Sequence, residues 1–277
     1  MFDKNKNKII ILGKDGFIAS EIIKTIKNYK FKYLAFSKKD INLLNKKNLF
    51  KLSRVIKKSD ILIFCSALAP VKNYDMYFQN IKMVENFLTI KNLNKLCSIC
   101  YLSSDAVFSD TSNKINENSD KNPENLHGLM HYTREKLLKL FHKKVFCVRP
   151  TLVYGENDPH NSYGPNRFIR SAQKNKKIQI FGNGEELRDH IYVKDIANTI
   201  IAILKLKRFE DINIVTGKVI SFAYIAKQIQ LKYKQVNIIK IKRKGAIPHN
   251  GFRAFDNKKM KDLNINPLTF KEYCNRL

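Results

Sequence analysis

Apolar runs alternate with helical periodicities along the first half of this chain. Short runs rich in β-branched residues predict buried strands over residues 8–12, 31–36, 60–64, 98–103 and 145–148. Between these runs, apolar residues recur at helical spacing, most clearly over residues 20–26, 75–93 and 126–142. Strands that alternate with helices predict an α/β fold with a doubly wound parallel sheet, in which ligands bind outside the carboxyl ends of the strands.

A glycine-containing turn follows the first predicted strand. Gly13, Gly16 and Ala19 have the spacing G-x-x-G-x-x-A between this strand and a helix. In such a turn, backbone N–H groups and the start of the helix can hold a pyrophosphate, and alanine at the third position still allows close helix–strand packing. The turn predicts a Rossmann-type dinucleotide site, with a purely structural turn as the alternative.

The end of the second predicted strand bears on the choice of cofactor. An acidic residue there, about 20 residues after the glycines, would bind the ribose 2′-hydroxyl of NAD. This chain has Ser37 followed by Lys38 and Lys39, which favour a 2′-phosphate. We therefore expect NADP(H) as the preferred cofactor, with NAD(H) as the alternative.

Beyond Gly155 the pattern becomes irregular. Residues 156–166 are rich in Asn, Pro, Gly and His, as in a loop, and short helices and strands follow. We predict an NAD(P)-binding Rossmann domain over residues 1–155, to which residues 190–217 return. Residues 156–189 and 218–277 are expected to form a smaller, discontinuous C-terminal substrate-binding lobe.

The composition is that of a globular protein with an unusual charge. Hydrophobic residues make up 44% of the 277, and no apolar run has the roughly 18–20 residues of a membrane span. The polar start, residues 1–8, does not resemble a secretion signal, so a cytoplasmic location without membrane attachment is expected. The net charge of +28 is consistent with nucleic-acid binding or with a general abundance of lysine. Because the lysines are scattered, we favour compositional bias and expect no nucleic-acid partner. The five cysteines complete no metal-ligand pattern, so no metal is expected.

One predicted helix and the strand end before it carry candidate chemistry. Tyr132 and Lys136 are four positions apart and project from the same helix face. A lysine ammonium beside a phenol favours the phenolate and lowers the pKa of the tyrosine, which can then exchange a proton near neutral pH. Ser104, at the end of the fourth predicted strand, could bind the oxygen that gains or loses that proton. These groups suit hydride transfer at a carbinol or carbonyl carbon; the alternative is an exposed tyrosine with a solvated lysine.

Five motifs occur in order along the chain. They are Gly13-x-x-Gly16-x-x-Ala19, Ser103-Ser-Asp-Ala-Val-Phe108, Tyr132-x-x-x-Lys136, Arg149-Pro-x-x-x-Tyr154-Gly155 and Gly182-x-Gly-x-x-x-Arg188-Asp-x-x-Tyr-Val-x-Asp195. Together they resemble the extended short-chain dehydrogenase/reductases and, more narrowly, the NAD-dependent epimerase/dehydratase family that acts on nucleotide sugars. Three positions depart from the family pattern: Thr133 stands where glycine is usual, Glu135 where serine or threonine is usual, and Ser109 after Phe108 where glycine is usual.

The resemblance implies roles for particular residues. Tyr132 would be the catalytic acid/base, Lys136 would assist it and bind the nicotinamide ribose, and Ser104 would bind the reacting oxygen. The other expected cofactor-binding residues are Gly13, Gly16, Phe17, Ile18, Ser37, Lys38, Asp40, Ile41, Cys65, Ser66, Ala67 and Asn80. The expected substrate-binding residues are Asp105, Asn166, Arg167, Arg188 and Arg253. Arg188 would bind the diphosphate of a nucleotide-diphosphate sugar, with a salt bridge to Asp189 or Asp195 as the alternative.

The residues after Ser104 narrow the expected reaction. Sugar 4,6-dehydratases of this family carry Asp then Glu there, and GDP-fucose synthases carry Cys at the second place, whereas this chain has Asp105 and Ala106. Since alanine cannot move protons, dehydration and 3,5-epimerisation are not expected, while 4-ketoreduction and 4-epimerisation need only the Ser, Tyr and Lys. The stretch is similar to the Ser-Thr-Asp-Tyr-Val-Phe of dTDP-4-dehydrorhamnose reductases, which favours 4-ketoreduction of an NDP-4-keto-6-deoxysugar.

Two alternatives stay open at this point. One is a nucleotide-sugar 4-epimerase, and the other, from a different class, is a non-catalytic nucleotide- or RNA-binding module on the same fold. From the resemblance, we also expect a homodimer through the predicted helices at 75–93 and 126–142.

Overall fold

The computed structural model describes residues 3 and 6–277, so part of the predicted polar start lies outside the described residues. The chain forms two compact units. Unit 1 comprises Met1–Ser109, Glu117–Arg149 and Ala197–Ile212, and unit 2 comprises Asp110–Asn116, Pro150–Ile196 and Asn213–Leu277. The unit boundaries near 149, 196 and 212 differ from the predicted ones at 155, 190 and 217, and Asp110–Asn116 were not expected in the second unit. The assignment of cofactor and substrate to separate domains stays a prediction.

Unit 1 is built around a parallel sheet. The strands β1 (Ile9–Leu12) and β3 (Ile61–Phe64) are buried at every residue, as continuous apolar runs predict for a sheet covered on both faces. The strand order is β2-β1-β3-β4-β5-β9, where the other strands are β2 (Tyr33–Phe36), β4 (Ser98–Leu102), β5 (Val145–Pro150) and β9 (Ile212–Ile214). The pairings of β1 with β2 and β3, of β3 with β4 and of β4 with β5 are all parallel. The predicted doubly wound parallel sheet is confirmed, and its strands end at one edge, next to Gly13, Cys65 and Ser103.

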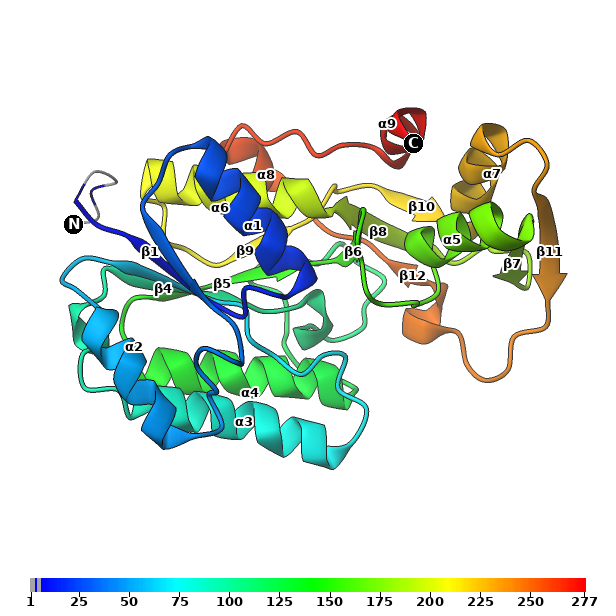
Figure 1. The fold of residues 1–277 in the computed structure, drawn as a ribbon. Helices are drawn as coiled ribbons and strands as arrows, with labels where there is room; N and C mark the ends of the chain where they lie inside the picture. The colour runs from blue at the N-terminus through cyan, green and yellow to red at the C-terminus, as the bar shows by residue number, and fades with distance from the viewer. Residues whose placement is uncertain (1–2, 4–5) are drawn as a thin grey trace. The chain divides into compact units, whose positions relative to one another are not determined.

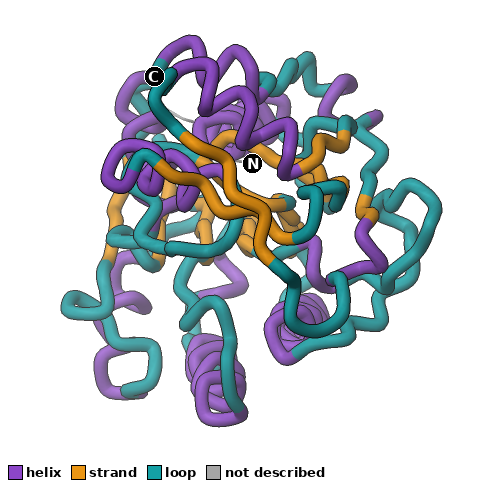
Figure 2. The backbone as a smooth tube through the Cα atoms, turned by 90° about the vertical axis from the view of Figure 1, so that its right-hand side faces the viewer, coloured by secondary structure: helices purple, strands orange, loops and turns teal. Residues whose placement is uncertain are grey.

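Helices cover both faces of this sheet. They are α1 (Phe17–Asn28), α2 (Leu49–Val55), α3 (Tyr74–Leu88), α4 (Leu126–Phe141) and most of α6 (Val193–Leu206), with short 3₁₀ turns η1 (Lys46–Asn48), η2 (Leu93–Lys95) and η3 (Asp105–Val107). The long helices α3 and α4 lie side by side on one face, and α1 lies on the other (Figure 1). Figure 2 shows the backbone from another side, with helices in purple and strands in orange. The helix predicted over 75–93 ends earlier, at Leu88, because the chain turns at Thr89 before η2. Within the described part of the chain, none of the helices combines the length and apolar character that a membrane crossing requires.

Unit 2 is centred on β8 (Leu187–Tyr192). This strand pairs with β6 (Leu152–Tyr154), β10 (Val219–Ser221) and β12 (Phe252–Arg253), while β7 (Lys177–Phe181) pairs in parallel with β11 (Asn237–Ile241). Its helical elements are α5 (Pro165–Asn175), α7 (Phe222–Lys232), η4 (Pro248–Gly251), α8 (Lys258–Asp262) and α9 (Phe270–Arg276). The strand β8 therefore carries Arg188 at the centre of this smaller sheet.

Candidate functional site

The glycine turn after β1 has the geometry of a dinucleotide cradle. Gly13 has φ +93°, and a Cβ there would lie 2.9 Å from the Ser66 amide nitrogen, so only glycine fits. Helix α1 begins at Phe17, and within the described residues no side chain caps its N-terminus at Gly16. The amides of the first helical turn, including that of Ile18, are therefore left for a ligand. The shape of this turn fits the pyrophosphate of a dinucleotide.

The turn after β2 is held together by Asp40. Its carboxylate accepts hydrogen bonds from the Ser37 amide and hydroxyl, each at 2.8 Å, and from Lys14 Nζ at 2.7 Å. The bond from Lys14, followed by those from Ser37, lowers the pKa of Asp40 well below its usual range. Lys38 is exposed beside this turn. The Ile41 side chain packs into the core, so its predicted contact with the cofactor would be made through its backbone.

The loop after β3 carries the predicted cofactor residues Cys65, Ser66 and Ala67, all half-buried. Asn80 of α3 fixes this loop, because its amide donates to the Leu68 carbonyl at 3.0 Å and accepts from the Leu68 amide at 2.9 Å. Asn80 is fully enclosed. In the structure Asn80 therefore supports the loop, and its contact with the cofactor stays a prediction. Burial raises the pKa of the Cys65 thiol to about 12, which keeps it protonated.

Gly128 brings the helix that carries Tyr132 against the turn that follows Ser104. The Ser104 hydroxyl caps η3 by accepting a hydrogen bond from the Ala106 amide at 3.2 Å. A Cβ on Gly128 would lie 2.0 Å from the Ala106 carbonyl oxygen, so α4 and η3 are in close backbone contact. Tyr132 follows one helical turn later and is half-buried, and Lys136 Nζ lies 5.3 Å from the centre of its ring. The structure thus places the three predicted catalytic residues on two touching elements.

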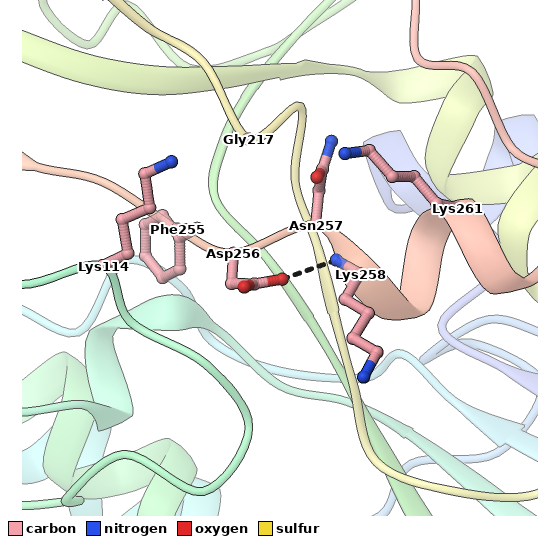
Figure 3. Close-up of a pocket in the computed structure, with 7 residues that line it drawn as sticks. All are labelled: Lys114, Gly217, Phe255, Asp256, Asn257, Lys258 and Lys261. Atoms are coloured by element: carbon pink, nitrogen blue, oxygen red, sulfur yellow. Dashed lines mark hydrogen bonds between the residues drawn. The ribbon is translucent and has the colours of Figure 1, made fainter.

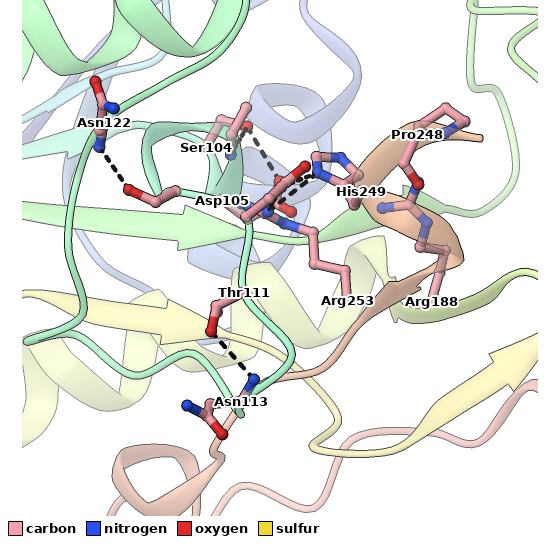
Figure 4. Close-up of polar contacts among 12 residues, drawn as sticks. Ser104, Asp105, Thr111, Asn113, Asn122, Arg188, Pro248, His249 and Arg253 are labelled. Atoms are coloured by element: carbon pink, nitrogen blue, oxygen red, sulfur yellow. Dashed lines mark hydrogen bonds and ion pairs between the residues drawn. The ribbon is translucent and has the colours of Figure 1, made fainter. Parts of the chain in front are cut away.

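Asp105, which the sequence suggested as a substrate contact, is half-buried next to Ser104. The Ser104 hydroxyl donates to Asp105 Oδ1 at 3.3 Å (Figure 4). The contact through Gly128 was missed in the sequence, although a glycine in the first turn of a long helix is a signal of close approach.

Two of the departures from the family pattern, Thr133 and Glu135, connect α4 to its neighbours. The Thr133 hydroxyl lies 3.1 Å from the Tyr77 hydroxyl of α3. Glu135 is buried and accepts two hydrogen bonds from Arg149, each at 2.7 Å, and a third from the Ser103 hydroxyl at 2.6 Å. Glu135 therefore joins the helix to the strand end that carries Ser104.

Arg149 lies at the centre of a buried ion network. It also donates to Asp211 at 2.7 Å, and Asp211 accepts from Lys139 at 2.6 Å. Burial raises the pKa of Asp211, but Arg149 and Lys139 outweigh this effect and lower it overall. Glu135, Cys147 and Asp211 lie close enough together to hold a metal ion. However, Arg149 already supplies the positive charge, and burial raises the pKa of the Cys147 thiol well above its usual value.

In unit 2, Arg188 is buried on β8 and is already paired. Its Nε and Nη2 groups donate to Glu186 Oε1 at 2.8 and 2.6 Å. Nη2 also donates to the Pro248 carbonyl at 3.0 Å (Figure 4). A salt bridge of Arg188 was the alternative at the sequence level, but its expected partners were wrong. Asp189 accepts instead from the Thr216 backbone, and Asp195 accepts from the backbone at Leu268.

Two further arginines of unit 2 are paired with carboxylates. Arg243 shares Glu186 at 2.6 Å, and Arg253 donates to Asp110 at 2.6 Å. His249 contacts both Asp110 and Arg253 (Figure 4). Burial lowers the pKa of His249, Asp110 opposes this effect, and the nearby Arg253 adds to it. Glu186, Arg243, Asp110 and His249 were not singled out in the sequence.

The start of α5 holds the other two predicted substrate residues. Asn166 is buried, accepts from the Gly155 amide at 3.1 Å and donates to Asp158 at 2.6 Å. Arg167 is half-buried, and no ion pair engages it within the described residues. Asn166 thus supports the loop before α5, and Arg167 is the better placed of the two to meet a ligand.

A lysine-rich pocket of unit 2 contains none of the predicted site residues. It encloses about 220 Å³. Figure 3 shows the seven residues that line it: Lys114, Gly217, Phe255, Asp256, Asn257, Lys258 and Lys261. The Asp256 carboxylate accepts from the Lys258 amide at 2.6 Å. The pocket is positively charged because Lys114, Lys258 and Lys261 line it together with this one carboxylate.

The sequence model of the NAD dependent epimerase/dehydratase family matches residues 9–215. This chain belongs to that family. It is 29% identical over 254 residues to the dTDP-D-glucose 4,6-dehydratase of Dictyostelium discoideum, which is 82% of this chain but only 56% of that protein. It is also 29% identical over 239 residues to a putative UDP-glucose 4-epimerase of Methanocaldococcus jannaschii, covering 76% of this chain and 77% of that one.

A solved structure matches the fold over nearly the whole chain. The dTDP-4-dehydrorhamnose reductase of Bacillus anthracis, crystallised with NADP, superposes with a TM-score of 0.81 over 98% of both chains at 21% identity. The family member described here therefore has the Rossmann-type fold that its sequence predicted.

Proposed function

We propose that this chain reduces the 4-keto group of a nucleotide-activated 4-keto-6-deoxysugar, with NADP(H) as the preferred cofactor. The observation that carries the proposal is the contact of α4 with η3, which presents Tyr132, Lys136 and Ser104 from touching elements. The names of the relatives, which specify dTDP and UDP sugars, support the substrate class. The NADP in the reductase of similar fold supports the cofactor.

The chemistry needs one hydride and one proton. The dinucleotide, when bound, supplies the hydride for the ketone carbon. Tyr132 donates its phenolic proton to the ketone oxygen, and the nearby Lys136 ammonium stabilises the phenolate that remains. Ser104 donates a hydrogen bond to the same oxygen. Hydride and proton together convert the ketone to an alcohol, and Tyr132 then regains its proton from water.

Dehydration is not part of the proposal, although a relative carries that name. Loss of water from a sugar needs a side chain that takes a proton from carbon. At the second position after Ser104 stands Ala106, whose amide bonds the Ser104 hydroxyl and whose carbonyl packs on Gly128. This position has no group that could accept the proton.

A nucleotide-sugar 4-epimerase is the second candidate. The match to the M. jannaschii protein, whose name specifies a putative epimerase, spans about three quarters of both chains. Epimerisation would use the same Tyr132, Lys136 and Ser104, but the cofactor would stay bound and be regenerated in each cycle. Tightly held NAD in the purified protein would favour this candidate.

Substrate binding is proposed for the arginines of unit 2. Arg188 and Arg253 would bind the diphosphate, as guanidinium groups bind phosphate oxygens in pairs. Within the described residues, Arg188 uses Nε and Nη2 for Glu186 and Pro248, which leaves its Nη1 group for a ligand.

A homodimer is proposed through α3 and α4. Large apolar side chains are exposed on these helices, among them Tyr74, Phe78, Leu140 and Phe141. Large apolar side chains that are exposed in one chain are often covered at an interface between copies. Light scattering should give twice the chain mass for the native protein and a single chain mass for Phe78→Glu.

The proposed reaction is tested by incubating the protein with NADPH, then NADH, and a panel of dTDP-, UDP- and GDP-4-keto-6-deoxysugars, while absorbance at 340 nm is followed. Oxidation that depends on one sugar is the expected result and identifies cofactor and substrate together. Tyr132→Phe should lower kcat about 10²–10⁴-fold and leave cofactor binding unchanged. Isomerisation of a sugar without net oxidation would instead establish the epimerase. If neither occurs, a nucleotide- or RNA-binding module becomes the better explanation.

A further inference from the structure

Arg134 is a fully buried arginine that lies between Tyr132 and Lys136 on α4. Its guanidinium lies 4.8 Å from the ring centre of Phe64 and 5.1 Å from that of Tyr101. Within the described residues its hydrogen-bond partners are neutral groups, and its Nε has none. Arg134 is thus a buried cation without a carboxylate partner in that part of the chain.

Such a group is costly unless its charge is used. Arg149, the other arginine deeply buried in unit 1, meets Glu135 in two hydrogen bonds. Arg134 has only aromatic ring faces and neutral acceptors around it. These contacts offset only part of the free-energy cost of removing its charge from water. An apolar side chain of similar length would fill the same space at lower cost. The contacts that only a guanidinium can make therefore indicate what Arg134 does at this position.

The main contact of Arg134 is with the loop after β3. Its Nη2 group donates to the Ser66 carbonyl at 2.8 Å, and its Nη1 group lies 3.4 Å from Asn80 Oδ1. Asn80 in turn bonds both the amide and the carbonyl of Leu68. One side chain of α4 therefore reaches two points that fix the loop 65–68.

The same loop touches the glycine turn from the other side. A Cβ at Gly13 would lie 2.9 Å from the Ser66 nitrogen and 3.0 Å from its Cα, so the Ser66 backbone packs directly on Gly13. The position of the Ser66 peptide thus limits the space in which a dinucleotide can lie. Arg134 bonds the carbonyl of that residue, and it stands on the helix that carries Tyr132.

We propose that Arg134 is a positioning residue for the dinucleotide site. By fixing the Ser66 carbonyl, it holds the loop 65–68 against Gly13 and keeps the cofactor site in register with Tyr132 and Lys136. The inference rests on the proposed function only in that a nicotinamide dinucleotide occupies the glycine turn.

The test measures cofactor affinity without any sugar. The chain contains no tryptophan, so the emission of NADPH can be titrated directly. Arg134→Met, which keeps the length but removes charge and donors, should weaken NADPH binding at least tenfold. Arg134→Lys keeps the charge but cannot bond Ser66 and Asn80 together, and should weaken binding three- to tenfold. Leu138→Ala is the matched control, since Leu138 is buried one turn further along α4 and its truncation destabilises the same helix. The NADPH affinity of this variant should stay within twofold.

Hydrogen exchange of the protein without cofactor gives a second readout. The amides of residues 65–69 should exchange at least tenfold faster in Arg134→Met than in the wild type, and Leu138→Ala should not show this local change. If Arg134→Met does not fold, wild-type affinity and exchange in Arg134→Lys overturn the proposal.

The outcomes separate this inference from the proposed function. Equal losses of affinity in Arg134→Met and Leu138→Ala, or none in either, overturn the role of Arg134 alone. A wild-type protein that binds neither NADPH nor NADH overturns the proposed function and this inference together. A wild type that binds NADPH but turns over no sugar, with the expected loss in Arg134→Met, overturns the reductase and supports the inference.

Discussion

The two units hold their predicted site residues in different ways. In unit 1, the decisive contacts are between backbones: Gly13 lies against Ser66, and Gly128 lies against Ala106. In unit 2, two of the predicted residues are arginines held by carboxylates, Arg188 by Glu186 and Arg253 by Asp110. The backbone contacts leave no room for a side chain, because a methyl group on either glycine would lie within 3 Å of the facing backbone. The second kind is made by side chains that can exchange one anion for another.

Under the proposed function, this difference would divide the tasks between the units. Proton and hydride transfer need groups held to within a fraction of an ångström, which close backbone packing provides. Recognition of a diphosphate needs positive charge that is held in place but can be shared, and an arginine beside a carboxylate provides that. Substitutions in either unit test whether this difference holds.

The largest effect is expected from Gly128→Ala. The added methyl group would meet the Ala106 carbonyl at 2.0 Å and force α4 away from η3. Since a displacement of about 1 Å can cost about 10²-fold in rate, kcat/KM of the sugar-dependent reaction should fall at least that far, while NADPH affinity stays within a few-fold. Leu129→Ala, at the adjacent, partly exposed position, is the control and should retain activity. Near-normal turnover in Gly128→Ala would show that this backbone contact does not set the catalytic geometry.

Glu135→Gln tests whether unit 1 also depends on ion pairs, in its interior. The change leaves Arg149 buried with a weakened partner, so the free energy of unfolding should fall by about 3–5 kcal/mol in urea titrations at pH 7. Glu85→Gln is the matched control, because Glu85 pairs with Lys82 on the exposed face of α3. That variant should change stability by less than about 1 kcal/mol. If Glu135→Gln and Glu85→Gln lowered the free energy of unfolding equally, the buried network would contribute no more to stability than an exposed ion pair.

Much of unit 1 could be predicted because its signals are local. The buried strands β1 and β3 are continuous apolar runs, and the residues at their ends follow directly in the sequence.

The ion pair of Arg188 with Glu186 in unit 2 could also have been predicted from the sequence. Residues two apart in an extended chain share a face, so Glu186 was a better partner than the adjacent Asp189, which points to the opposite face.

Other parts of the site depend on contacts that no local pattern contains. Asp110 and Arg253 are 143 positions apart, and their ion pair requires the segment Asp110–Asn116 to join unit 2. The glycine at 128 was visible, but its partner Ala106 was not, because the close approach depends on how α4 crosses η3. The support given by Arg134 and Asn80 to the loop 65–68 is of the same kind.

Arg188→Met should affect binding more than chemistry. If Arg188 meets the diphosphate, KM for the sugar nucleotide should rise about 10–100-fold and kcat should change by no more than a few-fold. Arg188→Lys should restore only part of this, since lysine lacks the planar fork. Arg170→Met is the control, because Arg170 is an exposed arginine of unit 2 that bonds the backbone at 158–160. A fall in kcat with unchanged KM would place Arg188 with the catalytic groups and remove the contrast between the units.

The smallest effect concerns Asp195, whose carboxylate in unit 2 is buried at the start of α6. Burial raises its pKa to about 6, although the Leu268 amide and Arg276 oppose the shift. The native state therefore binds this proton more tightly than the unfolded state, where the pKa is about 3.9, and stability falls as pH rises from about 4 to about 6. Asp195→Asn removes the cost of the buried charge while its side-chain oxygen can still accept from Leu268.

We expect Asp195→Asn to be about 1 kcal/mol more stable than the wild type at pH 7 and to lose this advantage at pH 4, in urea titrations at one-unit intervals. His190 is the internal control, because burial lowers its pKa to about 4 and it titrates alike in both proteins, so the difference between them isolates Asp195. If the difference in free energy of unfolding between the two proteins stayed constant from pH 4 to pH 7, burial would not raise the pKa of the Asp195 carboxylate. In that case the ion pairs of unit 2, rather than its buried acid, would account for the pH dependence of its stability.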